Sequence, residues 1–371
     1  MRVLLIGATG VVGRRVAAEL ARSKETETLF VAARTMDAVE RLAGSIGGTA
    51  GKVRPLVLDA TDYESLVPAF KEMDVVASCA GPAYLTEETS VAAALAAAVP
   101  YVSTCDDYPA TQAVTGLPGI EEAAAPVVSG CAMSPGISNM LVAKAASELD
   151  EVRGIEVAVA ASSNDPSGPA SELHLLAAFS AEAPMVAEGE LVTERASTDP
   201  MRMYFPEPVG WTETFWCGHP EVLAMRDRYP PATRISFRLG LTEKAAMDAV
   251  RASVAAGLVG SERKRRAWLR LSAPVRPLIE RIPPLGAAWT AVRVDVTGTR
   301  SKSPAHITFG VVDHLINLAA VPLAHATEAL GAGRVSGRGL TAPEDALEIT
   351  PFLQKLSRRG IRIARLEPHA L

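Results

Sequence analysis

Three glycines, Gly7, Gly10 and Gly13, have the spacing of a turn that could hold a phosphate group. They follow the short apolar run Val3 to Ile6, and apolar residues then recur with a helical period from Val11 to Leu20. Between a strand and a helix, glycines allow a sharp turn, close approach of a pyrophosphate and tight helix packing. The unpaired N–H groups at the helix start favour an anion there. We therefore predict that a dinucleotide contacts Gly7, Thr9, Gly10, Val11, Val12 and Gly13.

The spacing G-x-x-G-x-x-G alone is weak evidence, because a purely structural turn needs the same glycines. It is strengthened by a second apolar run, Leu29 to Ala33, which is followed by Arg34 and Thr35. In dinucleotide-binding domains this strand end contacts the adenosine ribose, about 20 residues after the glycines. An acidic residue suits the free 2′-hydroxyl of NAD, whereas Arg34 suits the 2′-phosphate of NADP. We predict NADP(H), with contacts at Arg34 and Thr35; NAD, or an Arg34 that is merely solvated, is the alternative.

Predicted strands and helices alternate through the first third of the chain. The further strands expected are 53–58, 74–80, 100–105 and 125–130, and the helices include 66–70 and 89–98. This alternation predicts an α/β fold with a Rossmann-like, doubly wound parallel sheet, whose ligands lie at the carboxyl ends of the strands. Asp59 at one such end either contacts the adenine half of the cofactor or caps the next helix. The other cofactor contacts expected at strand ends are Ala60, Cys79, Ala80, Gly81 and Pro82.

A second helix start is predicted after the sixth strand. Ser134 and Pro135 suit the cap and the first position of a helix that continues through Ala146. Its N-terminus would face the same cleft and favour an anionic group of the cofactor or substrate. A helix cap without any ligand is the alternative interpretation.

Composition describes an ordinary globular protein. The 371 residues are 48% hydrophobic and 21% charged, with a formal net charge of −5, so two domains are expected and nucleic acid is not expected as a partner. The basic run Arg263 to Arg266 is interpreted as the solvated face of a helix, and as a lipid-facing or acid-binding face in the alternative. Four cysteines without metal-ligand spacing indicate reduced thiols, a cytoplasmic location and no metal site. We expect neither a secretory signal nor a membrane span, because Phe309 to Leu330 contains Asp313 and His314 and is interpreted as a buried helix.

The middle of the chain lacks the regular alternation. Apolar or alternating runs predict strands at 152–161, 233–239 and 292–297, and helices at 172–181 and 241–256. This pattern is typical of an α+β domain with a mainly antiparallel sheet. A helix from about residue 311 to 330 is expected to cross back, and Phe352 to Arg365 to add a helix and a strand to the first domain.

Several segments, in order along nearly the whole chain, resemble the saccharopine dehydrogenase family in its short bacterial, NADP-binding form. The segments are GATGVVGRR, 57–62, 79–82, 101–108, 130–139, Gly218-His219-Pro220 after Trp216, and 337–361. The resemblance implies a Rossmann-like domain whose sheet is completed by the C-terminal segment, with a second domain inserted. We place these domains at 1–133, at 134–310 for substrate binding and dimerisation, and at 311–371 for the returning segment. It also implies hydride transfer, which in the best-known members reduces an imine.

The candidates for the proton transfer that such a reduction needs are less distinctive. His174 and His219 can titrate near neutrality. The alternative for His174 is a core histidine on an apolar helix face, and the alternative for His219 is a residue of a Gly-His-Pro turn. Asp106 and Asp107 are adjacent, so one is expected to face the cleft and the other to cap a helix. The predicted catalytic residues are therefore His174, His219 and Asp106. Candidates for binding a substrate carboxylate are Arg202, Tyr204, Tyr229, Arg234 and Arg238.

The sequence thus predicts an NADP-preferring oxidoreductase that acts on an imine, secondary amine or carbonyl of a small, amino-acid-derived molecule. Two alternatives stay open: a carbonyl or trans-acting enoyl reductase with a lipid or polyketide-type substrate, and a dinucleotide-binding protein without catalysis. The only other partner expected is a second copy of the chain, in a homodimer.

Overall fold

The computed structural model describes residues 1–46, 51–165, 167–180, 182–272 and 288–367. The chain forms two compact units, which are described separately. Unit 1 comprises Met1–Met140 and Ile316–Gly360, and unit 2 comprises Leu141–Leu315 and Ile361–Leu371. Each unit is therefore built from segments that are distant in the sequence.

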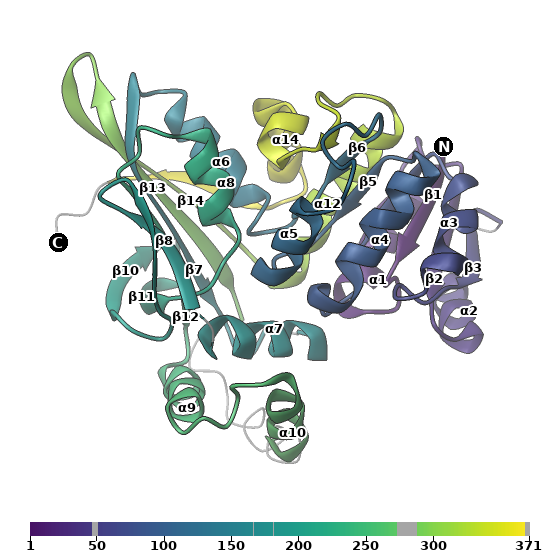
Figure 1. Ribbon diagram of the computed structural model, residues 1–371, viewed down its shortest axis with the longest axis horizontal. Coiled ribbons are helices and arrows are strands. Elements are labelled where there is room, and N and C mark those ends of the chain that lie inside the picture. Colours follow the sequence, from purple (N-terminus) through teal and green to yellow (C-terminus); the bar gives the residue numbers. More distant parts are fainter. Residues whose placement is uncertain (47–50, 166, 181, 273–287, 368–371) are drawn as a thin grey trace. The chain divides into compact units, whose positions relative to one another are not determined.

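Unit 1 contains a 7-stranded parallel sheet (Figure 1). Its strands in spatial order are β15 (Gly339–Leu340), β6 (Pro126–Val128), β5 (Tyr101–Ser103), β4 (Val75–Ser78), β1 (Arg2–Ile6), β2 (Thr28–Ala33) and β3 (Val53–Val57). The predicted doubly wound sheet, completed by the C-terminal segment through β15, is confirmed. The strand order reverses between β1 and β4, which is where such sheets bind their ligands.

Helices connect these strands and cover the sheet. They are α1 (Val11–Arg22), α2 (Met36–Ser45), α3 (Tyr63–Lys71), α4 (Ala83–Ala97), α5 (Tyr108–Thr115), α12 (Leu315–Gly331), α13 (Pro343–Ala346) and α14 (Ile349–Arg358). Helix α6 (Ile137–Ala146) begins in unit 1 and continues into unit 2. One core cluster joins Ile6 and Tyr101 of the sheet to Phe70, Val91 and Val114 of α3, α4 and α5. The alanine-rich α4 buries one face, which includes Ser90, Val91 and Ala94, because its small side chains let it pack closely.

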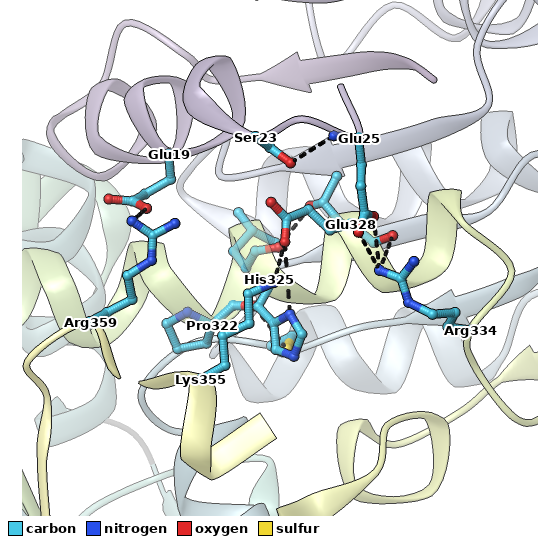
Figure 2. Close-up of polar contacts among 12 residues, drawn as sticks. Glu19, Ser23, Glu25, Pro322, His325, Glu328, Arg334, Lys355 and Arg359 are labelled. Atoms are coloured by element: carbon cyan, nitrogen blue, oxygen red, sulfur yellow. Dashed lines mark hydrogen bonds and ion pairs between the residues drawn. The ribbon is translucent and has the colours of Figure 1, made fainter. Parts of the chain in front are cut away.

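Ion pairs tie α12 and α14 to the segment around α1 (Figure 2). Arg359 lies 2.9 Å from Glu19, and the largely buried Glu328 pairs with Lys355. Arg334 lies 2.8 Å from Glu25, which follows α1. Residues 316–360 are therefore held to the rest of unit 1 by ion pairs as well as by β15.

Unit 2 contains a 9-stranded mixed sheet. Its strands in spatial order are β10 (Met201–Phe205), β11 (Gly210–Trp216), β12 (Arg234–Leu241), β7 (Glu151–Ala161), β13 (Thr290–Arg300), β14 (Ser303–Asp313) and β16 (Arg362–Leu366), with β8 (Glu182–Ala187) on β12 and β9 (Glu190–Arg195) on β8. The described helices are α7 (Pro169–Ser180), α8 (Glu221–Arg228), α9 (Lys244–Ala255) and α10 (Glu262–Ser272). Since among the described strands only β12 and β7 pair in parallel, the expected mainly antiparallel sheet is confirmed.

Two expectations for the last part of the chain are wrong. The helix expected from about residue 311 starts only at Leu315. The apolar residues from Phe309 to Val312 form the last part of β14, which is paired with β13 on one side and with β16 on the other. A short apolar run does not distinguish a central strand from a helix. The last strand, β16, joins β14 in unit 2, where antiparallel pairing satisfies its backbone groups, and not the parallel sheet. No helix in the described residues is both long and apolar enough to cross a membrane.

Candidate functional site

The glycine turn lies at the reversal of strand order, between the ends of β1 and β4. Gly7 has a φ of +75°, and a Cβ there would lie 2.6 Å from the backbone nitrogen of Ala80. A Cβ at Gly13 would lie 2.2 Å from the carbonyl oxygen of Gly7. By contrast, a Cβ at Gly10 would meet only this oxygen, at 3.3 Å. Gly7 and Gly13 are thus required by protein packing, whereas Gly10 leaves room for a ligand.

The start of α1 presents unpaired backbone donors. Gly10 is the N-cap and has no side chain to accept a hydrogen bond. Arg14 N donates to Gly10 O at 3.0 Å, which is the first hydrogen bond of the helix. In the described part of the chain, the N–H groups of Val11, Val12 and Gly13 have no acceptor. Together with the helix dipole, these amides form a site that suits a diphosphate.

The ends of β2 and β3 bring Arg34 near Asp59. Arg34 and Thr35 are exposed, and Thr35 is the N-cap of α2. Asp59 accepts hydrogen bonds from the backbone and the hydroxyl of Thr61, at 3.0 and 2.8 Å. These hydrogen bonds, and with them the charge of Arg34, lower the pKa of Asp59. The exposed guanidinium group of Arg34 therefore lies near an ionised carboxylate.

The alternative interpretation of Asp59 as a helix cap is wrong. The next helix, α3, begins at Tyr63, and its N-cap is Asp62. Asp59 lies three residues earlier and forms a local turn with Thr61 instead. Ala60 beside it is buried. A cofactor contact at either residue stays a prediction.

The segment Cys79 to Pro82 follows β4 and lies against the glycine turn. Cys79 N donates to Ile6 O at 3.1 Å, and Cys79 Sγ lies 3.6 Å from Gly7 O. Burial raises the pKa of Cys79 to about 12, so its thiol is unsuited to nucleophilic chemistry. Pro82 is the N-cap of α4, so Ala80 and Gly81 form the short exit from the strand. The predicted cofactor residues around β1 and β4 are therefore neighbours in the structure.

The prediction that Ser134 and Pro135 begin a helix is wrong. Helix α6 begins at Ile137, and the amide of Gly136 is held by Asn139 Oδ1 at 3.0 Å. Asn139 in turn donates to Glu344 at 3.1 Å, so α6 is fixed to α13. Ser134 and Pro135 are buried in the turn before the helix. A strong local capping pattern is here overridden by a tertiary contact.

A buried carboxylate that the sequence analysis missed lies beneath the same edge of the sheet. Glu87 of α4 is 2% exposed and accepts hydrogen bonds from three hydroxyl groups. The donors are Tyr101 at 2.9 Å, Ser103 at 2.5 Å and Ser129 at 2.9 Å. Burial raises the pKa of Glu87, which these hydrogen bonds offset only in part, and the charge of Asp106 raises it further. A helical spacing that places Glu87 with the buried Ser90, Val91 and Ala94 could have revealed it.

The predicted acid–base residues have different surroundings. In unit 1, Asp107 caps α5, because its side chain accepts a hydrogen bond from Ala110 N at 3.0 Å. Asp106 is the aspartate whose charge acts on Glu87. His219, in unit 2, is 3% exposed, with its ring stacked 3.7 Å from Phe237 and Nδ1 3.2 Å from Glu221. His174 is partly buried on α7, also in unit 2. Catalysis by any of the three stays a prediction, and His219 has the surroundings of a core histidine.

Unit 2 has a cavity of about 230 Å³ on its sheet. Three of the five residues predicted to bind a substrate carboxylate line this cavity, and two do not. Arg202, Tyr204 and Arg234 line the cavity with Trp211. Arg238 does not, because it is buried and paired with Asp199 and with Glu156, 2.6 Å away. Tyr229 also lies outside the lining.

The cavity has more positive than negative charge available to a ligand. Its two acidic residues are already paired, Glu156 with Arg238 and Asp295 with Arg293 and His306. Burial opposes ionisation of Asp295, but hydrogen bonds from His306 and Arg293 lower its pKa to about 2. In the described residues Arg202 and Arg234 have no acidic partner. The arrangement suits an anion such as a carboxylate.

Comparison with known proteins gives a family match within unit 1. Residues 3–125, about a third of the chain, match the family described as the saccharopine dehydrogenase NADP binding domain. The resemblance noted in the sequence is thereby confirmed for this domain, which carries the glycine turn, Arg34, Glu87 and Asp106.

The saccharopine dehydrogenase-like fold extends over both units. The chain is similar to the apo saccharopine dehydrogenase (L-Glu forming) from Saccharomyces cerevisiae, with a TM-score of 0.71, 18% identity, and 99% of this chain and 100% of that chain covered. It is also similar to an amine dehydrogenase from Mycobacterium smegmatis, with a TM-score of 0.50, 10% identity, and coverage of 94% and 96%. No curated protein sequence matches the chain. Within the described residues no group of acidic, histidine or cysteine side chains could hold a metal ion.

Proposed function

We propose that the protein is an NADP(H)-dependent oxidoreductase that transfers a hydride to or from the carbon of an imine or secondary amine, or of a carbonyl group. The observation that carries the proposal is the set of unpaired amides at Val11, Val12 and Gly13, opened to a ligand by Gly10. They lie in a domain whose family is named for NADP binding. NADPH, when bound, supplies the hydride.

The residues of unit 1 fit this cofactor. The amides at the start of α1 would bind the diphosphate, and the exposed Arg34 would bind the 2′-phosphate. Asp59 and Thr61, beside Arg34, would face the adenosine half. The residues after β4, β5 and β6 would then position the nicotinamide half, as expected from the rule that ligands lie along the carboxyl edge of the sheet.

Two observations support a nitrogen-containing, anionic substrate. The two structurally similar proteins are named a saccharopine dehydrogenase and an amine dehydrogenase, and we infer the same class of bond for this chain. The cavity of unit 2 offers Arg202 and Arg234 to a carboxylate and the half-exposed ring of Trp211 to an apolar part. We infer a substrate derived from an amino acid.

The experiment is a turnover assay on the full chain. The absorbance of reduced nicotinamide is followed with NADPH and a panel of amino acids paired with carbonyl compounds, and with NADP⁺ and secondary amines. We expect saturable turnover of an amino-acid-derived substrate and no turnover of acyl thioesters. Turnover of acyl thioesters alone would establish a lipid-type reductase instead. Saturable NADPH binding without turnover of any substrate would establish a binding protein without catalysis.

A further inference from the structure

Among the residues that the structure describes, the groups that hydrogen-bond Glu87 cannot neutralise its charge. All three of its hydrogen-bond donors are hydroxyl groups, from Tyr101, Ser103 and Ser129. In the described chain no lysine, arginine or histidine pairs with it. The titratable groups that act on it are Tyr101, Cys105 and Asp106, none of which is cationic. A carboxyl group in this position is therefore costly for stability, which calls for another reason for its presence.

Two of the three donors, Ser103 and Ser129, lie at the strand ends that border the proposed nicotinamide half of the cofactor site, and Tyr101 begins the strand that Ser103 ends. Tyr101 and Ser103 are two residues apart on β5, so they face the same side of the sheet, and Ser129 directly follows β6. Ser78 of β4 is the partner of Ser103 in the pairing of β4 with β5. Glu87 thus contacts β5 and the end of β6 directly, and it is linked to β4 through the pairing of Ser103 with Ser78.

Each strand end in this network leads directly into a loop of the predicted site. Ala80 N donates to Ser78 Oγ at 3.4 Å, which fixes the exit of Cys79 to Pro82. Cys105 N donates to Ser103 Oγ at 3.3 Å, one residue before Asp106. Cys131 N donates to Ser103 O at 2.6 Å, two residues after Ser129. The position of the carboxyl group of Glu87 therefore determines the position of three loops at once.

We propose that Glu87 is a positioning residue, which holds the ends of β4, β5 and β6 in the arrangement that binds the nicotinamide half of NADP(H). The inference rests on the proposed function. Glu87 contacts neither the glycine turn nor Arg34, so the adenosine half and the diphosphate should bind without it. The role is one of geometry, because buried side-chain networks determine the orientation of the groups that meet a ligand.

The test compares two probes on the full chain. NADPH spans the whole site, whereas 2′,5′-ADP carries only the adenosine half with the 2′-phosphate. Dissociation constants are measured by calorimetry for the wild type, Glu87→Ala and Glu87→Gln. Gln keeps the shape and can still accept from Ser103 and Ser129, so it serves as the second variant should Ala fail to fold. Glu328→Gln is the control, because Glu328 is also a buried carboxylate of unit 1 but pairs with Lys355.

We expect Glu87→Ala to weaken NADPH binding about tenfold and Glu87→Gln about threefold, as for the loss of one to two hydrogen bonds. The affinity for 2′,5′-ADP should stay unchanged in both, and Glu328→Gln should alter neither. An equal loss of affinity for NADPH and for 2′,5′-ADP would show that Glu87 has a merely structural role. Unchanged NADPH affinity in either folded variant would show that Glu87 does not position the cofactor site. Both results overturn the inference but leave the proposed function standing. A wild type that binds neither probe overturns the proposed function and the inference together.

Discussion

Two buried carboxylates of unit 1, Glu87 and Glu328, have opposite surroundings. Glu328 of α12 pairs with Lys355 and lies 4.0 Å from His325 (Figure 2). Burial opposes its ionisation, but the nearby His325, the hydrogen bond from Lys355 and the nearby Ser23 lower its pKa to about 2. Burial also opposes ionisation of Glu87, whose hydroxyl donors leave the pKa raised. A cation thus reverses the effect of burial on a carboxyl group, and three hydroxyl groups do not.

The different surroundings of the two carboxylates indicate different roles, stability for Glu328 and ligand binding for Glu87. Glu328 fixes α12 to α14 and gives the fold an ion pair. Glu87 weakens the fold by its burial but connects the strand ends beside the candidate cofactor site. Structures often place destabilising groups where a ligand binds. The predictions below alter one of these regions at a time.

The largest effect is expected from Gly10→Val in the glycine turn. A side chain there occupies the approach of the diphosphate, while the φ of −69° suits any residue. We expect NADPH affinity to fall at least about a hundredfold, as several contacts to the diphosphate are lost together, with little change in Tm. Gly44→Val, at a glycine with nothing within 4 Å, is the control for calorimetry. Full NADPH affinity in Gly10→Val would mean that the diphosphate binds elsewhere.

Glu328→Gln should destabilise the protein without affecting the cofactor. Its pKa falls from 4.5 to about 2 on folding, so its contribution is present above pH 4.5 and is lost as the pH falls toward 2. We expect a loss of about 2 kcal/mol in the free energy of unfolding at neutral pH, since Lys355 is partly exposed. Urea unfolding at several pH values measures it. A difference from wild type that is as large at pH 2 as at pH 7 would contradict the assignment.

Arg34→Ala should change the choice of cofactor. Without its guanidinium group the 2′-phosphate loses a charge-assisted contact, so NADPH affinity should fall about tenfold. NADH lacks this phosphate, and its affinity should stay the same. Titration of intrinsic fluorescence with both nucleotides measures the ratio, and Arg22→Ala in the last turn of α1 is the control. An equal loss for both nucleotides would assign Arg34 a structural role.

The smallest effect is expected on stability in Glu87→Gln. Because its pKa is raised in the folded state, wild-type Glu87 contributes most below pH 4.5 and loses that contribution as the pH rises through the folded value. Gln carries no charge, so the variant should gain stability relative to wild type as the pH rises, by about 1 kcal/mol. Thermal unfolding across this pH range measures the gain. A relative loss of stability at higher pH would contradict the raised pKa.

The parallel sheet was predictable from the sequence because its central strands, such as β1 and β4, are buried and appear as continuous apolar runs. The hairpin β8–β9 was not, since Glu190–Arg195 is mostly exposed and has no regular alternation. The sheet to which β16 belongs is decided by pairing with β14, which leaves no local pattern. Prediction therefore succeeded where burial shapes the local sequence, and failed where distant pairing decides.

The same distinction holds in the candidate site. The glycine turn and Arg34 are local features, set by the needs of backbone and ligand at consecutive positions. Glu87 shares a helical face with the buried Ser90, Val91 and Ala94, which signals burial, but its partners on β5 and after β6 are distant in the sequence and leave no local pattern. His219 shows the reverse case, a residue conspicuous in the sequence that is buried against Phe237.

Hydrogen exchange of the backbone amides, with and without NADPH, tests the central claim most directly. The account holds that the amides of Val11, Val12 and Gly13 bind the cofactor diphosphate. We expect NADPH to slow their exchange strongly, with weaker protection around Arg34 and in Cys79 to Pro82. Protection confined to unit 2, or unchanged exchange at the start of α1 in saturating NADPH, would contradict it.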